Sequence, residues 1–213
     1  FIPILTIMGV INIALLVLDI TGKSQLALHL ARTGGMLFTL LMTVIGGRVI
    51  PFFTVRGANT APIRMPALFE HINLAAVVCS VIVYALGPDL ISTTVFSVIM
   101  FFTGFLQVIR IGFWRTLNTL SVPLLWSLHL SYLLMASGTL LLGASQLNIG
   151  VQVSSALHLI TIGAIGLMII SMMSRVSLGH TGRMLTPKPI ISWAFMMIAV
   201  AAIIRVIFPY FGM

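Results

Sequence analysis

Two of the five histidines in this chain lie in the same four-residue word, Ala-Leu-His-Leu. The word occurs at residues 27–30 and again at residues 156–159, and it contains His29 and His158. Imidazole nitrogens from two facing helices are the ligands that a six-coordinate haem iron requires, and they also suit copper. The repeat therefore predicts a site in which His29 and His158 are the axial ligands of one haem.

Two arginines accompany these histidines. Arg32 follows His29 by about one helical turn, and Arg205 lies near the end of the last apolar segment. Because guanidinium groups pair well with carboxylates, Arg32 and Arg205 are candidates to bind the haem propionates. The alternative is that His29 and His158 are ordinary polar residues at the ends of packed membrane helices.

The similarity between the two copies continues beyond the histidines. Each copy ends on Arg-Val, at Arg48 and at Arg175, with a threonine six residues after the arginine. A further arginine, Arg183, lies in the segment that follows the second copy. These arginines predict that both copies end on the same side of the membrane.

The other three histidines, His71, His129 and His180, are candidates for a second metal site, with copper as the metal. No His-x-x-x-His spacing joins them. His129 lies deep inside an apolar run, so its ring nitrogens need partners. The alternative for His129 is a hydrogen bond inside the bundle, for which Ser127, Ser131 and Tyr132 are the nearest groups in the sequence.

The composition explains what must position these residues. Apolar residues make up 60% of the chain, charged residues only 7%, and the mean hydropathy is +1.20. Soluble domains contain about 25% charged residues, so this chain is expected to lie in a lipid bilayer. The net charge of +8 comes from cations placed singly at the ends of apolar runs, which argues against a nucleic-acid partner. The single Cys79 excludes an internal disulfide, and the lack of a Cys-x-x-Cys-His motif excludes covalently attached haem.

Apolar runs of about 20 residues can span a bilayer as helices, and the chain contains seven of them. They predict an all-α, polytopic membrane bundle that forms a single domain over residues 1–213. The predicted spans are residues 1–20, 25–53, 66–86, 90–110, 122–143, 151–178 and 190–209.

The basic residues predict the orientation of these spans. Eight of the eleven cations fall on the side reached after the second span, and short loops rich in Lys and Arg stay in the cytoplasm. The second and sixth spans then run in the same direction, as a repeat related by an axis along the membrane normal. Both spans then begin at the outer face, so that His29 and His158 are expected near that face. The cations assigned to the cytoplasm are Arg48, Arg56, Arg64, Arg110, Arg115, Arg175, Arg183 and Lys188, and those assigned outside are Lys23, Arg32 and Arg205.

Few residues in the sequence suit catalysis. The only acids are Asp19, Glu70 and Asp89, and no Gly-x-Ser-x-Gly, P-loop or His-Glu-x-x-His motif occurs. Ion-coupled transporters usually carry a carboxylate at mid-membrane, and we expect none here. Whether the chain is an enzyme is left open by the sequence.

Three segments resemble the NnrS family. They are "LHLITIGAIGLMIISMMSRVSLGHTGR" at residues 157–183, "GGRVIPFFT" at 46–54 and "GFWRTLNTLSVPLLWSLHLSY" at 112–132. The resemblance implies a bacterial inner-membrane protein of the nitric oxide response, with non-covalent haem b and with copper as a second metal. Members of this family have about twelve helices, which implies that this chain is the C-terminal part of a longer protein.

Three functions compete at this point. The first is a membrane haem protein that handles nitric oxide or electrons and protects against nitrosative stress. The second is a haem or copper transporter or chaperone, whose histidines pass the metal on. The third is a structural bundle in which every histidine is hydrogen bonded.

Overall fold

The computed structural model describes residues 2–87, 90–147 and 149–211, and the regular structure in these ranges is entirely helical. Seven helical spans are long and apolar enough to cross a membrane within the described residues. The predicted all-helical, seven-span bundle is confirmed, and the chain is a multi-pass membrane protein. The helices are α1 (Ile2–Ile20), α2 (Ser24–Gly57), α3 (Ala67–Leu86), α4 (Thr93–Phe113), α5 (Pro123–Ala144), α6 (Val153–His158), α7 (Leu167–His180) and α8 (Pro189–Ile207).

Three short elements complete the fold. A 3-10 turn, η1 (Thr116–Thr119), joins α4 to α5, and another, η3 (Phe208–Phe211), follows α8. The third, η2 (Leu159–Gly166), is π-helical and joins α6 to α7, so that the sixth span runs without a break from Val153 to His180.

Local sequence explains several helix ends. Ser92 precedes α4, and its hydroxyl accepts a hydrogen bond from the amide of Val95, as an N-cap should. Pro123 and Pro189 open α5 and α8 at first positions, where a missing N–H costs nothing. Gly87 follows α3 with φ +76°, a conformation that glycine adopts without strain.

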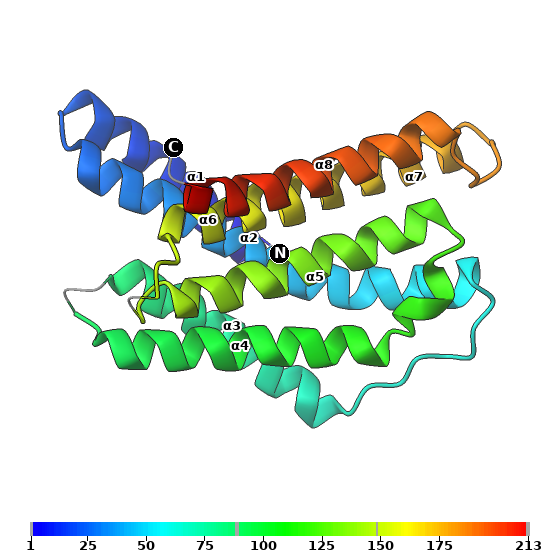
Figure 1. Cartoon of the computed structure of the whole chain (residues 1–213), viewed down its shortest axis with the longest axis horizontal. Helices are drawn as coiled ribbons and strands as arrows, with labels where there is room; N and C mark the ends of the chain where they lie inside the picture. Colours follow the sequence, from blue (N-terminus) through cyan, green and yellow to red (C-terminus); the bar gives the residue numbers. More distant parts are fainter. Residues whose placement is uncertain (1, 88–89, 148, 212–213) are drawn as a thin grey trace.

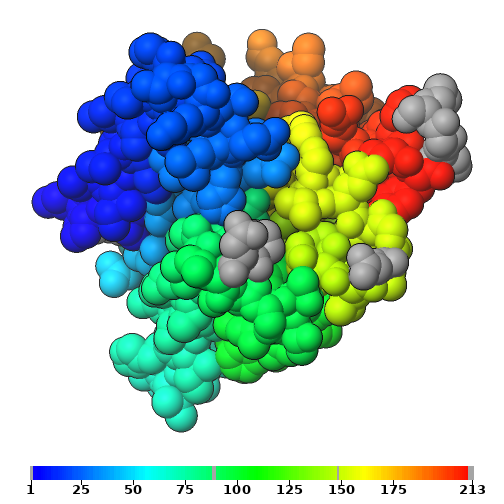
Figure 2. All heavy atoms as spheres, turned by 90° about the vertical axis from the view of Figure 1, so that its left-hand side faces the viewer, coloured from blue at the N-terminus to red at the C-terminus, as the bar shows by residue number. Residues whose placement is uncertain are grey.

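The helix α5 is the most deeply buried span and organises the bundle. It packs against α4, α6, η2 and α7, and it lies between the α3–α4 pair and the α7–α8 pair in Figure 1. By contrast, α1 has no buried residue and packs on α2 at the rim, which Figure 2 shows at the blue edge of the molecule. The core is therefore built by the second to sixth spans together with one face of α8, which contributes Phe195, Ala199 and Ala202.

The second and sixth spans run in the same direction, as the sequence predicted (Figure 1). Their local structures differ, however. The α2 helix is regular along 34 residues and contains Pro51, whereas the sixth span has eight π-helical residues in its first half. A π-helical segment turns the residues on either side of it toward different faces. The predicted rotation axis between the two copies stays a prediction.

The cations assigned to the cytoplasmic side divide into two groups. Arg110 and Arg175 are not loop residues: they lie in α4 and α7 and are only 3% and 8% exposed. Neither arginine therefore belongs in a count of exposed charges. The six that remain are all exposed, so the excess over the three outer cations persists: Arg48, Arg56, Arg64, Arg115, Arg183 and Lys188.

We predict that the segment around Thr181 faces the cytoplasm. In a Cys79→Ser background, Thr181→Cys should react with a membrane-impermeant maleimide only after the cells are opened, because its side carries the excess of Lys and Arg. Thr21→Cys, a matched control in the segment between α1 and α2, should react in intact cells. The opposite labelling pattern would show that the orientation is inverted.

Candidate functional site

The start of α2, the end of α3 and the start of α4, which lie on the predicted outer side, enclose a pocket of about 280 Å³ that contains two of the predicted site residues, His29 and Arg32. We call it the outer pocket. Aromatic walls are supplied by Tyr84 and Phe96, and most of the remaining lining is apolar or amide-bearing. The other lining residues are Gln25, Leu28, Gly87, Ile91, Thr93, Gln146 and Val153.

His29 is held in this pocket by two contacts with α3. Its Nε2 lies 3.0 Å from the carbonyl oxygen of Ala85, and its ring stacks on Tyr84 with 5.9 Å between centroids and 4° between planes. A carbonyl can only accept a hydrogen bond, so Nε2 carries the proton and Nδ1 carries the lone pair. Histidines that bind metals are commonly oriented by such a bond from the other ring nitrogen.

His158 is placed differently. Its Nδ1 lies 2.6 Å from the carbonyl oxygen of Ser154, one turn earlier in the same helix. The ring lines a second pocket, of about 330 Å³, together with Arg205 and Phe208 at the end of α8. Each predicted histidine thus shares a pocket with one of the predicted arginines: His29 with Arg32, and His158 with Arg205.

The prediction that His29 and His158 face one cavity is therefore wrong. Axial ligands of a single iron must approach it from opposite faces of the same macrocycle, and these rings line separate pockets. The cause lies in the sixth span, where His158 is the last residue before the π-helical segment and bonds back to its own helix. The position of each histidine in its span predicted how far along the helix the ring lies, but not toward which side of the helix it points.

His129 is fully buried, with both ring nitrogens already bonded. Nε2 lies 2.8 Å from the hydroxyl of Thr54 in α2, and Nδ1 lies 2.9 Å from the hydroxyl of Thr116 in η1. The edge of the ring meets Trp114. The hydrogen-bonded interpretation holds, although its partners are threonines from other elements rather than the neighbouring Ser127, Ser131 or Tyr132.

The predicted second metal site is not assembled. His71 lies exposed in the first turns of α3, and His180 lies exposed at the end of α7, while His129 is committed to its two threonines. In the parts of the chain that the structure describes, no group of three His, Cys, Asp or Glu side chains could hold a metal ion.

A buried ionic network, which the sequence did not predict, lies between the start of α3 and the end of α4. The guanidinium of Arg110 binds both carboxylate oxygens of Glu70, one of them from Nε at 2.9 Å. Its Nη1 donates to the carbonyl oxygen of Thr43 and to the hydroxyl of Tyr132, each at 2.8 Å. We call Thr43, Glu70, Gln107, Arg110 and Tyr132 the Arg110 network.

The network is closed by a glutamine. The hydroxyl of Tyr132 donates to Oε1 of Gln107, and Nε2 of Gln107 donates to the hydroxyl of Thr43 at 3.2 Å. The side chain of Arg110 is 4% exposed and that of Glu70 is 34% exposed. A charge at this depth is tolerated only when it is paired and its remaining donors are bonded. Glu70 lies in the first turn of α3 rather than at mid-membrane.

A signal for this pair was present in the sequence. Glu70 lies three residues into the third span and Arg110 lies three residues before the end of the fourth, and adjacent spans run antiparallel. The two side chains must therefore meet at the same level. Gln107 of α4 and the buried Asn73 of α3 also lie at matching levels of the two antiparallel helices. Neither side-chain amide atom of Asn73 has a hydrogen-bond partner among the described residues.

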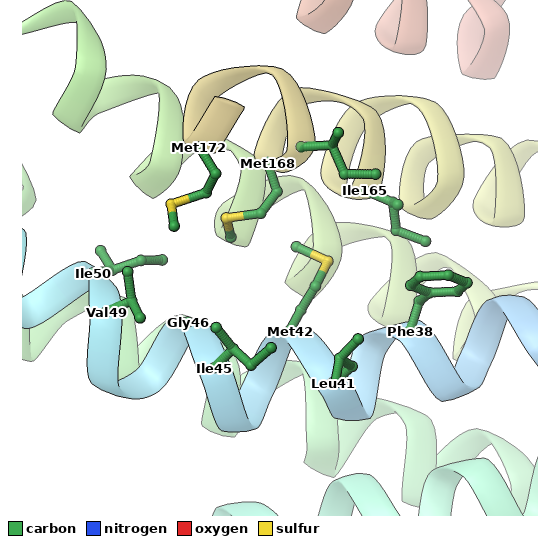
Figure 3. A pocket seen from close by; sticks show the side chains of 11 residues that line it. Phe38, Leu41, Met42, Ile45, Gly46, Val49, Ile50, Ile165, Met168 and Met172 are labelled. Atoms are coloured by element: carbon green, nitrogen blue, oxygen red, sulfur yellow. The ribbon is translucent and has the colours of Figure 1, made fainter. Parts of the chain in front are cut away.

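The second and sixth spans face each other across an apolar pocket of about 260 Å³ (Figure 3). We call it the α2–α7 groove. Met42 of α2 and Met168 and Met172 of α7 extend into it, alongside isoleucine, leucine, valine and phenylalanine side chains. With no polar group that could orient a substrate, this groove is suited to an apolar occupant.

The remaining arginines of the repeat also differ. Arg48 and Arg183 are exposed, whereas Arg175 is buried with its guanidinium carbon 3.9 Å from the ring centroid of Phe53. Because one is exposed and the other is buried, the expected equivalence of Arg48 and Arg175 does not extend to their environments.

Comparison with known proteins identifies one family. The family model described as NnrS protein matches residues 1–213, which is the whole chain. No curated protein and no solved structure matches the chain.

We predict that Gly47 is required for the Arg110 network. A Cβ at this position would overlap the guanidinium of Arg110, whereas a Cβ at Gly112 of α4 would meet nothing within 4 Å. Gly47→Ala should lower the free energy of unfolding by about 1–3 kcal/mol, since the arginine must shift from its partners. Gly112→Ala should be neutral or stabilising by about 0.5–1 kcal/mol. Thermal unfolding in detergent measures both, and equal melting temperatures would count against a fixed position for Arg110.

Proposed function

The chain belongs to the NnrS family, and on this premise we propose that it is a haem protein of the bacterial inner membrane that acts in the nitric oxide response. Haem b would be bound without covalent attachment in the outer pocket. The observation that carries the proposal is that His29 and Arg32, one turn apart on α2, line the same pocket.

The outer pocket contains one histidine, His29, that could bind a haem iron. Hydrogen bonding of Nε2 to Ala85 leaves Nδ1 of His29 as the free lone pair, which is the state that a metal ligand needs. Arg32 supplies a cation for a propionate carboxylate. Haem held by His29 would supply the iron at which nitric oxide could bind.

The other residues of the pocket have supporting roles. The carbonyl of Ala85 and the ring of Tyr84 fix the tautomer and the plane of His29. Apolar side chains such as Phe96 and Ile91 exclude water from the imidazole. A volume of about 280 Å³ is close to the lower limit of ligand pockets.

Copper does not enter this proposal. The histidines expected to bind it are separate, and His129 has no free nitrogen. The methionines of the α2–α7 groove are accompanied by no imidazole or thiolate in its lining, and methionines commonly fill irregular apolar space.

We predict that haem binding depends on His29 and not on His158. The full chain, loaded with haem in detergent, should show a Soret band that His29→Ala removes or weakens by at least about tenfold in haem affinity, since the ligand to the metal is lost. Arg32→Gln should keep the band and weaken binding, because one ion pair is removed. Nitric oxide added to the reduced, loaded protein should shift the band.

Two variants serve as controls for this prediction. His71→Ala alters an exposed histidine outside the pocket, and His158→Ala alters the ring in the second pocket. Both should retain the wild-type spectrum. An unchanged spectrum in His29→Ala would overturn the proposal, and equal losses in His29→Ala and His158→Ala would restore the two-histidine site. Stoichiometric transfer of haem to an apoprotein acceptor would indicate the transport or chaperone function instead.

A further inference from the structure

Another polar pocket, separate from those of His29 and His158, lies between the C-terminal parts of α2 and α7. It has a volume of about 420 Å³ and combines three basic side chains with two phenylalanines. We call it the basic pocket. It lies on the side of the bundle that carries the excess of exposed cations. Its lining includes Phe52, Phe53, Arg56, Arg175 and His180.

Arg175 is the unusual group in this pocket. It is 8% exposed, and no hydrogen bond or ion pair joins it to a side chain in the described residues. A guanidinium has five N–H donors, and burying a charge without a partner is costly. The face of the guanidinium is covered by Phe53 at 3.9 Å, so its N–H edge is the part left to bind an anion.

Arg56 of α2 is also stacked on a phenylalanine ring. Its guanidinium carbon lies 4.2 Å from the ring centroid of Phe52, and the residue is exposed. Two guanidinium groups stacked on neighbouring phenylalanines thus line one pocket. The N–H edge of a guanidinium matches two oxygens of a phosphate, which is why arginine is preferred for phosphate recognition.

The protein supplies no anion for these cations within its described residues. Glu70 is bound by Arg110, and Asp19 lies at the end of α1, next to the start of α2. Arg56 lies at the other end of the 34-residue α2 helix, which is about 50 Å long. The third acid, Asp89, lies outside the described residues. A counter-ion for Arg175 would therefore come from another molecule.

The apolar α2–α7 groove continues from the basic pocket along the same two helices. Ile50 and Met172 line the groove, and Phe53 and Arg175, one turn further along each helix, line the basic pocket. The groove is open to the lipid, since Ile45 is 36% exposed and Ile169 is 48% exposed. A basic pocket at the membrane surface that leads into an apolar groove matches a phosphate headgroup followed by an acyl chain.

We propose that the α2–α7 interface is a binding site for an anionic phospholipid. The phosphate binds between Arg56 and Arg175, and one acyl chain lies in the α2–α7 groove against Met168 and Met172. Basic pockets between membrane helices on the cytoplasmic side are suited to anionic lipid headgroups. The proposal is independent of haem binding at the outer pocket.

Lipid retention by the full chain tests this site. The purified protein, in detergent supplemented with either phosphatidylglycerol or phosphatidylcholine of identical acyl chains, is measured by native mass spectrometry and by thermal unfolding. The wild type should retain phosphatidylglycerol and unfold at a higher temperature with it. Arg175→Gln should bind it about tenfold more weakly, since a charge-assisted bidentate contact is lost. Arg175→Lys should fall between the two, because it keeps the charge and loses the fork.

Three further measurements complete the test. Arg64→Gln removes an exposed cation outside the pocket and should leave retention unchanged. Ile169→Trp fills the groove without touching a charge and should weaken retention as well. It also keeps the test valid if Arg175→Gln fails to fold. Inorganic phosphate in excess should not displace the lipid. Equal retention of both lipids, an equal loss in Arg64→Gln, full retention in Ile169→Trp, or displacement by phosphate would overturn the proposal.

Discussion

A buried guanidinium in a membrane bundle is stable only when it is paired and hydrogen bonded, and Arg110 finds its partners on three other spans. The hydrogen bonds that Arg110 of α4 donates reach Thr43 of α2, Glu70 of α3 and Tyr132 of α5. Van der Waals packing alone discriminates weakly between helix arrangements in lipid, because lipid tails are as apolar as leucine. A network whose members must all be satisfied fixes the rotation of each helix. Gly47 leaves room for the guanidinium of Arg110, which a Cβ at this position would overlap.

The fixed rotations decide what lies at the two ends of the same helices. At the outer end, α2 presents His29 and Arg32 to α3, where Tyr84 and the carbonyl of Ala85 orient the imidazole. At the inner end, α2 presents Phe52, Phe53 and Arg56 toward α7. One helix, held at its middle by Thr43, therefore contributes to both proposed binding sites. A change in the Arg110 network is expected to reach both of them through the orientation of α2.

The sequence was sufficient for properties that depend on depth along the membrane normal. Length and hydropathy predicted seven spans, and the order of the spans predicted that α2 and the sixth span run in the same direction. The sequence did not predict how each helix is rotated about its own axis. The two copies of Ala-Leu-His-Leu gave His29 and His158 similar depths, yet a π-helical segment directly after His158 belongs to one copy alone. Arg110 was taken for a loop cation because it ends an apolar run, although Glu70 at the matching level of the antiparallel neighbour indicated a pair.

Hydrogen bonding separates the histidines by the work that each can do. His129 gives both nitrogens to threonines, so a metal could bind only after a buried contact was broken and a hydroxyl was left without its partner. His29 gives one nitrogen to a backbone carbonyl, which cannot be replaced by mutation of a side chain and which leaves the second nitrogen for a ligand. The most deeply placed imidazole is thus structural, and the one nearer the surface is available for chemistry. Burial alone would have ranked them in the opposite order, and the count of bonded nitrogens decides between them.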